Sequence, residues 1–312
     1  MMPFVPVGDR GTVVTVGSFD GVHRGHEAVL GEIARRAAAA GRRSVLVTFD
    51  PHPMEVVNPA AAPQLLTTGP ERREILAQTA LDYAVLLRFD RALARLTPAE
   101  FVRKILVAGC GMRELVIGHD HGFGRGRQGD VALLQGLGAE LGFAVDVVPA
   151  LEVDGHTVSS TLVRRAVAGG DLALATRLLG RPYFATGQVV PGDGRGKAIG
   201  FPTANLAGVP PRKLLPPDGV YAVRVEWRWG RALGMMNQGG RPTFHQADRT
   251  LEVHLLDHAG DLYGEWLKVE WVARLRDVQR FPSVDALRAQ LERDRSSARA
   301  ALAAAATGTL ST

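Results

Sequence analysis

Two histidines lie three residues apart in a glycine-rich segment, GSFDGVHRGH, at positions 17–26. The segment follows an apolar run at 12–16 and precedes a pattern with apolar residues on one helical face, which predicts a strand, a turn and a helix. His23 and His26 then lie at the helix start, where unpaired N–H groups and the positive dipole end attract an anion. Gly25 lets the backbone come close to a ligand. Two imidazoles that donate hydrogen bonds to phosphate oxygens indicate a nucleoside triphosphate site.

A second phosphate-binding pattern lies at 158–164, VSSTLVR. Ser160 and Thr161 come at a predicted helix start, and Arg164 follows one turn later. Hydroxyls, free N–H groups and a guanidinium are typical phosphate ligands. An ordinary helix cap followed by an exposed arginine is the alternative, and it is the commoner reading of the segment alone. Paired with the two histidines in one domain, the segment favours phosphate binding.

Oxygen-bearing side chains follow a glycine-rich stretch at 192–201. This stretch is not the familiar phosphate loop, because Lys197 is followed by alanine. If the next segment is extended, Thr203 and Asn205 project from the same side, and their oxygens suit a hard cation such as Mg²⁺ that bridges to ATP phosphates. Glu252 lies on an alternating strand pattern at 250–255, where a solvent-facing glutamate is the ordinary alternative.

The elements that position these residues change character near residue 182. Before it, strands and helices alternate, which predicts an α/β Rossmann-like domain with a parallel sheet that binds ligands at the carboxyl ends of its strands. After it, strands follow one another closely, which predicts an antiparallel sheet or small β-barrel with a terminal helix. We therefore expect two domains, 1–182 and 183–312. We expect Ser283 to cap the last helix, which runs through about residue 293. The pattern leaves open that this helix continues into the alanine-rich stretch at 298–306, which we interpret as a frayed helix end and not as a functional segment.

The individual elements follow from the apolar periodicity. In the first part we expect strands at 12–16, 44–49, 83–87, 114–117 and 143–148, and helices at 71–80, 98–107 (behind a Thr97 capping box), 130–141, 160–168 and 171–179. In the second part we expect strands at 219–227, 231–236, 250–256 and 268–275.

The length and composition limit the number of domains, the kind of ligand and the cellular compartment. The chain has 312 residues, 46% of them apolar, a formal net charge of +5 and one cysteine, Cys110. The length suits about two domains, and the basic balance suits anionic ligands, although no long Lys/Arg block is present. A single cysteine excludes an intrachain disulfide and is typical of a reducing compartment. Since we find neither a secretory signal nor a run as long as a membrane span, we expect a cytoplasmic protein.

These segments resemble those of a known family, in the same order along the chain. His-x-Gly-His after the first strand resembles the nucleotidyltransferase signature, and Ser-Ser-Thr-x-x-Arg is similar to the segment that closes over ATP phosphates in that superfamily. The stretch 118–130 resembles a flavin-facing loop, with His121 where phenylalanine is more usual and Asp120 at the polar position. The stretch 237–257 is similar to a riboflavin kinase domain. The whole resembles the bifunctional riboflavin kinase/FMN adenylyltransferases, or bacterial FAD synthetases.

The resemblance implies an enzyme with two reactions. The second domain phosphorylates riboflavin to FMN with ATP, and the first transfers AMP from another ATP to FMN, giving FAD and pyrophosphate. It implies Glu252 as general base, His23 and His26 as catalytic residues, and Mg²⁺ held by Thr203 and Asn205. No protein nucleophile is required, because in-line attack needs positioning and charge stabilisation. The residues expected to bind nucleotide or flavin are Gly17, Phe19, Gly25, Asp120, Ser160, Thr161, Arg164, Gly194 and Lys197.

Three alternatives stay open at this point. The chain could be a different adenylyltransferase, or one of its domains could be inactive. A nucleic-acid-binding barrel is the alternative from another class, and it requires exposed aromatic residues interleaved with basic ones. Trp227 and Trp229 form the one candidate cluster, and a hairpin edge accounts for them. We expect riboflavin, FMN, FAD and ATP as ligands, no nucleic acid or membrane partner, and a monomer or weak homo-oligomer.

Overall fold

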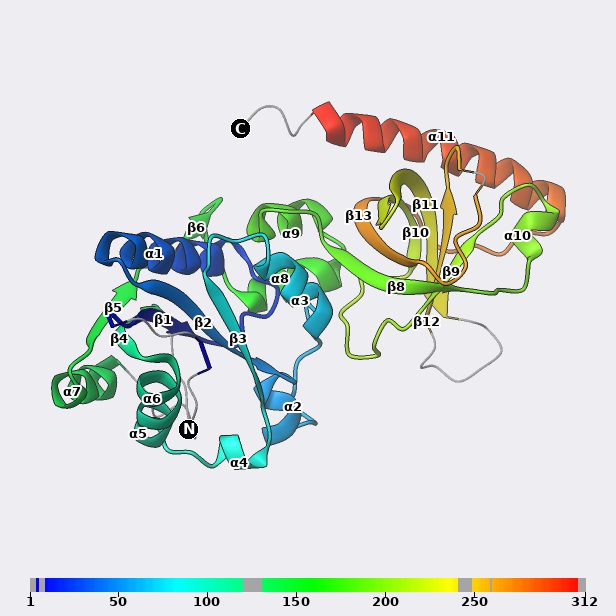
Figure 1. Cartoon of the computed structure of the whole chain (residues 1–312). Helices are drawn as coiled ribbons and strands as arrows, with labels where there is room; N and C mark the ends of the chain where they lie inside the picture. The colour runs from blue at the N-terminus through cyan, green and yellow to red at the C-terminus, as the bar shows by residue number, and fades with distance from the viewer. Residues whose placement is uncertain (1–3, 6–8, 120–130, 241–248, 259, 308–312) are drawn as a thin grey trace. The chain divides into compact units, whose positions relative to one another are not determined.

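The structure is a computed structural model that describes residues 4–5, 9–119, 131–240, 249–258 and 260–307. The chain divides into two compact units, Met1–Ser160 and Thr161–Thr312 (Figure 1). Helices α8 (Ser160–Gly169) and α9 (Leu172–Leu179) therefore group with the second unit. Each unit is described by itself.

The first unit is built on a five-stranded parallel sheet in the order β3-β2-β1-β4-β5. Strand β1 is buried over its whole length. The strand order reverses direction at β1, between β2 and β4, and such a switch point is where open parallel sheets bind ligands. The predicted α/β class is confirmed. The strands are β1 (Thr12–Val16), β2 (Arg43–Asp50), β3 (Tyr83–Arg88), β4 (Met112–Gly118) and β5 (Ala144–Val148).

Helices cover both faces of this sheet. Figure 1 shows α1 on one face and α5, α6 and α7 on the other. The Thr97 capping box is confirmed, since Thr97 Oγ1 accepts from Glu100 N at 3.2 Å. The helix it begins is α-helical only at its ends, with a π-helical middle that the sequence pattern did not predict. The elements are α1 (Arg24–Ala40), α2 (Pro53–Val57), α3 (Gly69–Leu76), α4 (Arg91–Ala94), α5 (Pro98–Phe101), η1 (Val102–Val107), α6 (Ala108–Cys110), α7 (Val131–Leu141), β6 (Glu152–Val153) and β7 (His156–Thr157).

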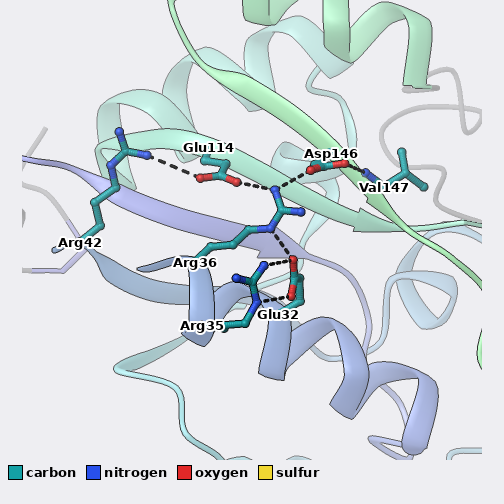
Figure 2. A network of polar contacts seen from close by, with 7 residues as sticks. All are labelled: Glu32, Arg35, Arg36, Arg42, Glu114, Asp146 and Val147. Atoms are coloured by element: carbon teal, nitrogen blue, oxygen red, sulfur yellow. Dashed lines mark hydrogen bonds and ion pairs between the residues drawn. The ribbon is translucent and has the colours of Figure 1, made fainter. Parts of the chain in front are cut away.

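A charged network fastens α1 to the sheet (Figure 2). Arg36 contacts Glu32 at 2.6 Å, Glu114 of β4 at 2.7 Å and Asp146 of β5 at 2.5 Å. Arg35 pairs with Glu32 at 2.7 Å. Hydrogen bonds from Arg35 and Arg36 lower the pKa of Glu32 from 4.5 to about 2. Because Glu114 lies near the start of β4, the network holds α1 without occupying the carboxyl edge of the sheet.

The second unit is a closed antiparallel barrel in the order β10-β11-β12-β9-β8-β13. The predicted barrel is confirmed. Strands β8 and β9 close it, and the sequence pattern predicted neither as a strand. The elements are β8 (Phe184–Val190), α10 (Arg195–Ala198), β9 (Ala204–Ala207), β10 (Gly219–Trp227), β11 (Gly230–Gly240), β12 (Arg249–Leu255), β13 (Trp266–Arg276) and α11 (Val284–Thr307).

Helix α11 lies along the barrel (Figure 1). Ser283 caps it as predicted, since its Oγ accepts from Ala286 N at 3.2 Å. The helix continues through the alanine-rich stretch, as the sequence allowed, but the beginning of that stretch is not frayed, because α11 buries Ala298 and Leu302 in the core beside β10 and β11. Asp294, buried on the inner side of α11, accepts from Arg276 of β13 at 2.7–3.0 Å.

No helix among the described residues is long and apolar enough to cross a membrane.

Candidate active sites

The turn after β1 brings three rings into one stack. The ring centroids of Phe19 and His26 are 4.4 Å apart, and those of His26 and His23 are 3.7 Å apart with an angle of 15° between the rings. His23 caps α1, because its Nδ1 accepts from His26 N at 3.3 Å. Since Nδ1 accepts this bond, a neutral His23 carries its ring proton on Nε2. The two predicted histidines therefore lie together at the start of α1.

The backbone of this turn is held in an unusual conformation. Phe19 and Val22 have φ angles of 48° and 40°, which side-chain-bearing residues rarely adopt and which the surrounding structure must maintain. Buried Asp20 supplies that support, since its carboxylate accepts from Leu66 N at 3.0 Å and from Thr67 N at 2.9 Å. The carboxylate thus locks the turn to the segment before α3.

Ser160 belongs to the same arrangement. Its Oγ donates to the carbonyl oxygen of Asp20 at 3.0 Å, so this residue of the second predicted phosphate-binding segment contacts the first segment. Thr161 is exposed and Arg164 is half-buried, both on α8. Asp120, with its neighbour His121, lies outside the described residues.

The glycines of the turn have a packing role in addition to the predicted one. A Cβ on Gly25 would lie 3.2 Å from His23 Nδ1, and a Cβ on Gly17 would lie 3.1 Å from the ring of Phe19. Both contacts are tighter than ordinary van der Waals distances. Glycine at these positions therefore allows the ring stack to form.

Sequence reasoning missed Arg72 on α3. Its guanidinium is buried and donates to the carbonyl of Ser18 at 2.9 Å and to the carbonyl of Phe49 at 2.5 Å, so it joins the ends of β1 and β2. Burial lowers the pKa of Arg72 from its ordinary value. The segment PERREIL gave no signal for this role, because an arginine on a short helix is usually solvated.

The second candidate site lies on the barrel wall. Asn205 of β9 and Asn237 of β11 are the register partners of Glu252 on either side of β12. Directly opposed residues of antiparallel strands project from the same face. The structure therefore brings predicted Asn205 and Glu252 into one row, with Asn237 as a third member. Asn237 was missed because only the strand register reveals it.

The glycine-rich stretch folds against the same side chains. A Cβ on Gly192 would overlap the amide of Asn205, and a Cβ on Gly196 would lie 3.5 Å from Thr203 Oγ1. Gly194 has a φ of 70° at the start of α10, a conformation that favours glycine. Lys197 is exposed on α10. Glycine loop, hydroxyl, amide and carboxylate thus converge on one region of the barrel.

Comparisons with known proteins match both units. The family model described as FAD synthetase matches residues 6–162, and the one described as riboflavin kinase matches residues 179–302. The bifunctional riboflavin kinase/FMN adenylyltransferase of Escherichia coli strain K12 is 43% identical over 93% of this chain and 92% of its own. The chain belongs to this family of bifunctional riboflavin kinase/FMN adenylyltransferases. The resemblance found in the sequence is confirmed.

More distant members of the bifunctional riboflavin kinase/FMN adenylyltransferase family match over the same span. The enzyme so named from Pseudomonas fluorescens is 42% identical over 95% of each chain, and that from Bacillus subtilis strain 168 is 33% identical over 92% of this chain and 91% of its own. A solved structure titled as a macrolide-efflux protein from Streptococcus pneumoniae is 32% identical, covers 95% of each chain and has a TM-score of 0.84. The fold of that solved structure therefore extends over nearly the whole chain.

Proposed function

We propose that this chain makes FAD in two steps at two separate sites, with a domain for each at 183–312 and 1–182. ATP is the co-substrate of both, as the two enzyme domains of the family require. Riboflavin is phosphorylated to FMN, and FMN is adenylylated to FAD. The observation that carries the proposal is the pairing of Asn205 with Glu252 in a chain that also holds the His23–His26 stack.

Glu252 is the proposed general base of the phosphorylation. Its carboxylate accepts the proton of the ribityl hydroxyl as the hydroxyl oxygen bonds to the γ-phosphorus of ATP. The bond from that phosphorus to the bridging oxygen breaks, and ADP leaves with its electron pair. Gly194 and Lys197 are proposed to bind the nucleotide from the glycine-rich stretch.

Thr203 and Asn205 are the proposed Mg²⁺ ligands. Their oxygens are the hard donors that this cation prefers, and Gly192 and Gly196 keep the space beside them free of side chains. No group of three or more His, Cys, Asp or Glu side chains in the described part of the chain is placed to hold a metal. In this proposal the cation is bound by these two neutral oxygens together with nucleotide phosphates. When bound, Mg²⁺ offsets the charge of the transferred phosphoryl group.

His23 and His26 are the proposed catalytic residues of the adenylyl transfer. At the start of α1 they stabilise the triphosphate while a phosphate oxygen of FMN attacks the α-phosphorus of ATP and pyrophosphate leaves. The nucleotide and flavin are proposed to be bound by Gly17, Phe19, Gly25, Asp120, Ser160, Thr161 and Arg164. The hydrogen bond from Ser160 to Asp20 supports this grouping for Ser160.

A single assay tests the proposal. The purified chain is incubated with riboflavin, ATP and Mg²⁺, and the flavins are separated by chromatography. We expect both FMN and FAD. FMN without FAD, whether the assay starts from riboflavin or from FMN, would contradict the two-site function and indicate an inactive first domain.

We further propose a monomer or weak homo-oligomer in the cytoplasm with no nucleic-acid partner. Cys110 is free and buried, which suits a reducing compartment.

Trp227 pairs with Gly230 where the β10–β11 hairpin closes, so the position of the tryptophans at a hairpin edge supports the interpretation that they bind no nucleic acid. Trp229 is exposed, and the guanidinium carbon of Arg228 lies 4.4 Å from the centroid of its ring. A salt titration against RNA or DNA tests this, because phosphate-driven binding weakens steeply with salt.

A further inference from the structure

His254 is a buried polar side chain that the proposed chemistry does not use. It lies on β12 two residues after Glu252, so both side chains project from the same face. The residue is only 9% exposed, and its Nδ1 lies 2.7 Å from the carbonyl oxygen of Pro202. A carbonyl oxygen only accepts hydrogen bonds, so Nδ1 carries the proton and donates it.

The peptide group that His254 holds leads directly into Thr203. The carbonyl of Pro202 and the nitrogen of Thr203 belong to one planar unit, so fixing the carbonyl orients the backbone of Thr203. The register of β9 with β12 begins at Ala204 and Val253. The side-chain bond from His254 therefore extends the attachment of this segment to β12 beyond the end of the ladder.

The residue before Pro202 is anchored independently. Phe201 is buried with Ala298 and Leu302 of α11, and its ring centroid is 5.2 Å from that of His254. Phe201 N donates to the carbonyl of Gly196 at 2.8 Å, which ties the glycine-rich stretch to the same segment. Thr203 thus follows a segment held by apolar packing on one side and by one imidazole hydrogen bond on the other.

We propose that His254 is a positioning residue for phosphoryl transfer, which sets the backbone that carries Thr203 and Asn205 toward magnesium nucleotide. The inference rests on the proposed role of these two residues. His254 touches no reacting atom in this scheme, and Glu252 remains the base. Loss of its hydrogen bond therefore weakens the binding of magnesium nucleotide while leaving the binding of riboflavin nearly unchanged.

A matched pair of variants tests the inference. His254→Phe keeps a ring against Phe201 but removes the donor, whereas His254→Asn keeps an N–H near the position of Nδ1. We measure the affinity for Mg²⁺–ADP by calorimetry, and the KM values for Mg²⁺–ATP and riboflavin in the kinase assay. His254→Phe is expected to weaken Mg²⁺–ADP binding and raise the KM for Mg²⁺–ATP by roughly fivefold to tenfold, as loss of one hydrogen bond predicts. His254→Asn is expected to recover most of both.

Adenylylation of supplied FMN, which uses the proposed site at His23 and His26, is expected to be unchanged in both variants, and thermal unfolding reports whether the barrel is folded. Unchanged Mg²⁺–ADP affinity in His254→Phe would overturn the inference, as would equal loss in both folded variants. If thermal unfolding shows that His254→Phe has lost the barrel, His254→Ala replaces it as the variant without a donor: weakened Mg²⁺–ADP binding that His254→Asn recovers supports the inference, and unchanged affinity in folded His254→Ala overturns it. A wild-type chain that binds Mg²⁺–ADP but forms no FMN would refute the proposed kinase reaction, while the binding measurements still decide the role of His254.

Discussion

Asn205 and Glu252 face each other across the β9–β12 pair, although they belong to segments far apart in the sequence. The proposed cation ligand and the proposed base are therefore kept side by side by backbone hydrogen bonds of the barrel. A slip of one residue in this register would turn one of the two side chains to the opposite face. The relative position of these two groups is thus fixed by strand pairing in the barrel and not by the conformation of a loop.

Replacing Glu252 with Gln tests its role as general base. The substitution keeps the shape of the side chain but removes its ability to accept a proton. We expect riboflavin phosphorylation to fall at least about a hundredfold, while adenylylation of supplied FMN persists. Glu226→Gln, at an exposed position on β10, is the matched control. Near-normal kinase turnover in folded Glu252→Gln protein would show that Glu252 is a solvent-facing residue and not the general base.

The His26→Ala variant is expected to abolish FAD formation from FMN and to spare riboflavin phosphorylation. It removes the middle ring of the stack and a phosphate contact worth on the order of a few kcal/mol in the transition state. Chromatography of the two assays measures both activities. His156→Ala, at an exposed position on β7, is the control. Equal loss of both activities would show that the effect is on folding.

The Gly192→Ala variant tests whether the glycine-rich stretch packs against the proposed cation ligands. In Gly192→Ala the new Cβ overlaps the Asn205 amide, so one of the two must move. We expect the kinase to need roughly tenfold more Mg²⁺ for half-maximal activity, because displacement of one ligand weakens a site with few protein donors. In Gly31→Ala nothing lies within 4 Å of the new Cβ, and this variant should behave as wild type. Unaltered Mg²⁺ dependence in Gly192→Ala would separate Gly192 from the site.

Two fragments test the domain boundary. A fragment from Tyr183 onward contains all six barrel strands and is expected to fold and to phosphorylate riboflavin. A fragment from Thr161 onward also contains α9, which contacts β13 and buries Leu178 and Leu179. We expect this longer fragment to unfold at a higher temperature. Equal thermal stability would show that α9 contributes nothing to the barrel, and an insoluble shorter fragment would argue against a boundary near residue 182.

Glu32 gives the first unit a predictable response to acid. Its pKa in the folded chain is about 2, below the ordinary 4.5, because Arg35 and Arg36 donate hydrogen bonds to its carboxylate. The stabilisation is therefore fully present above about pH 4.5 and is lost as the pH falls toward 2. Urea unfolding of wild type and Glu32→Gln across this range measures it. The difference in unfolding free energy between the two should shrink as the pH falls, and a constant difference would contradict the assignment.

The sequence patterns predicted most of the long elements, because apolar periodicity is strong in strands such as 219–227 and in helix 171–179. They missed β8 and β9, whose assignment depends on pairing partners rather than on their own residues. They missed the π-helical turn at 102–107 for a similar reason, since its apolar residues also satisfy an α-helical pattern. The local sequence therefore predicted the long helices and strands better than it predicted the strand pairings between them.

The site shows the same division. His23 and Asn205 were predicted from residue type and spacing, whereas the role of Glu252 was predicted from the resemblance to riboflavin kinases. Arg72 was missed because an arginine that donates to two backbone carbonyls looks, in sequence, like any surface arginine. Asn237 could be recognised only once the β11–β12 register was known. The strand register places segments that are far apart in the sequence next to each other. This register cannot be predicted from the residues of one segment alone.

Strand β9 is only four residues long, yet it pairs with β12 on one side and β8 on the other, and it carries Asn205. The strand that completes the barrel is thus the strand that carries the proposed cation ligand. A chain whose barrel has opened at β9 keeps its other strands but loses the alignment of Asn205 with Glu252. Closure of the barrel therefore also aligns the two residues of the proposed phosphorylating site, and a chain opened at β9 is expected to lose riboflavin phosphorylation.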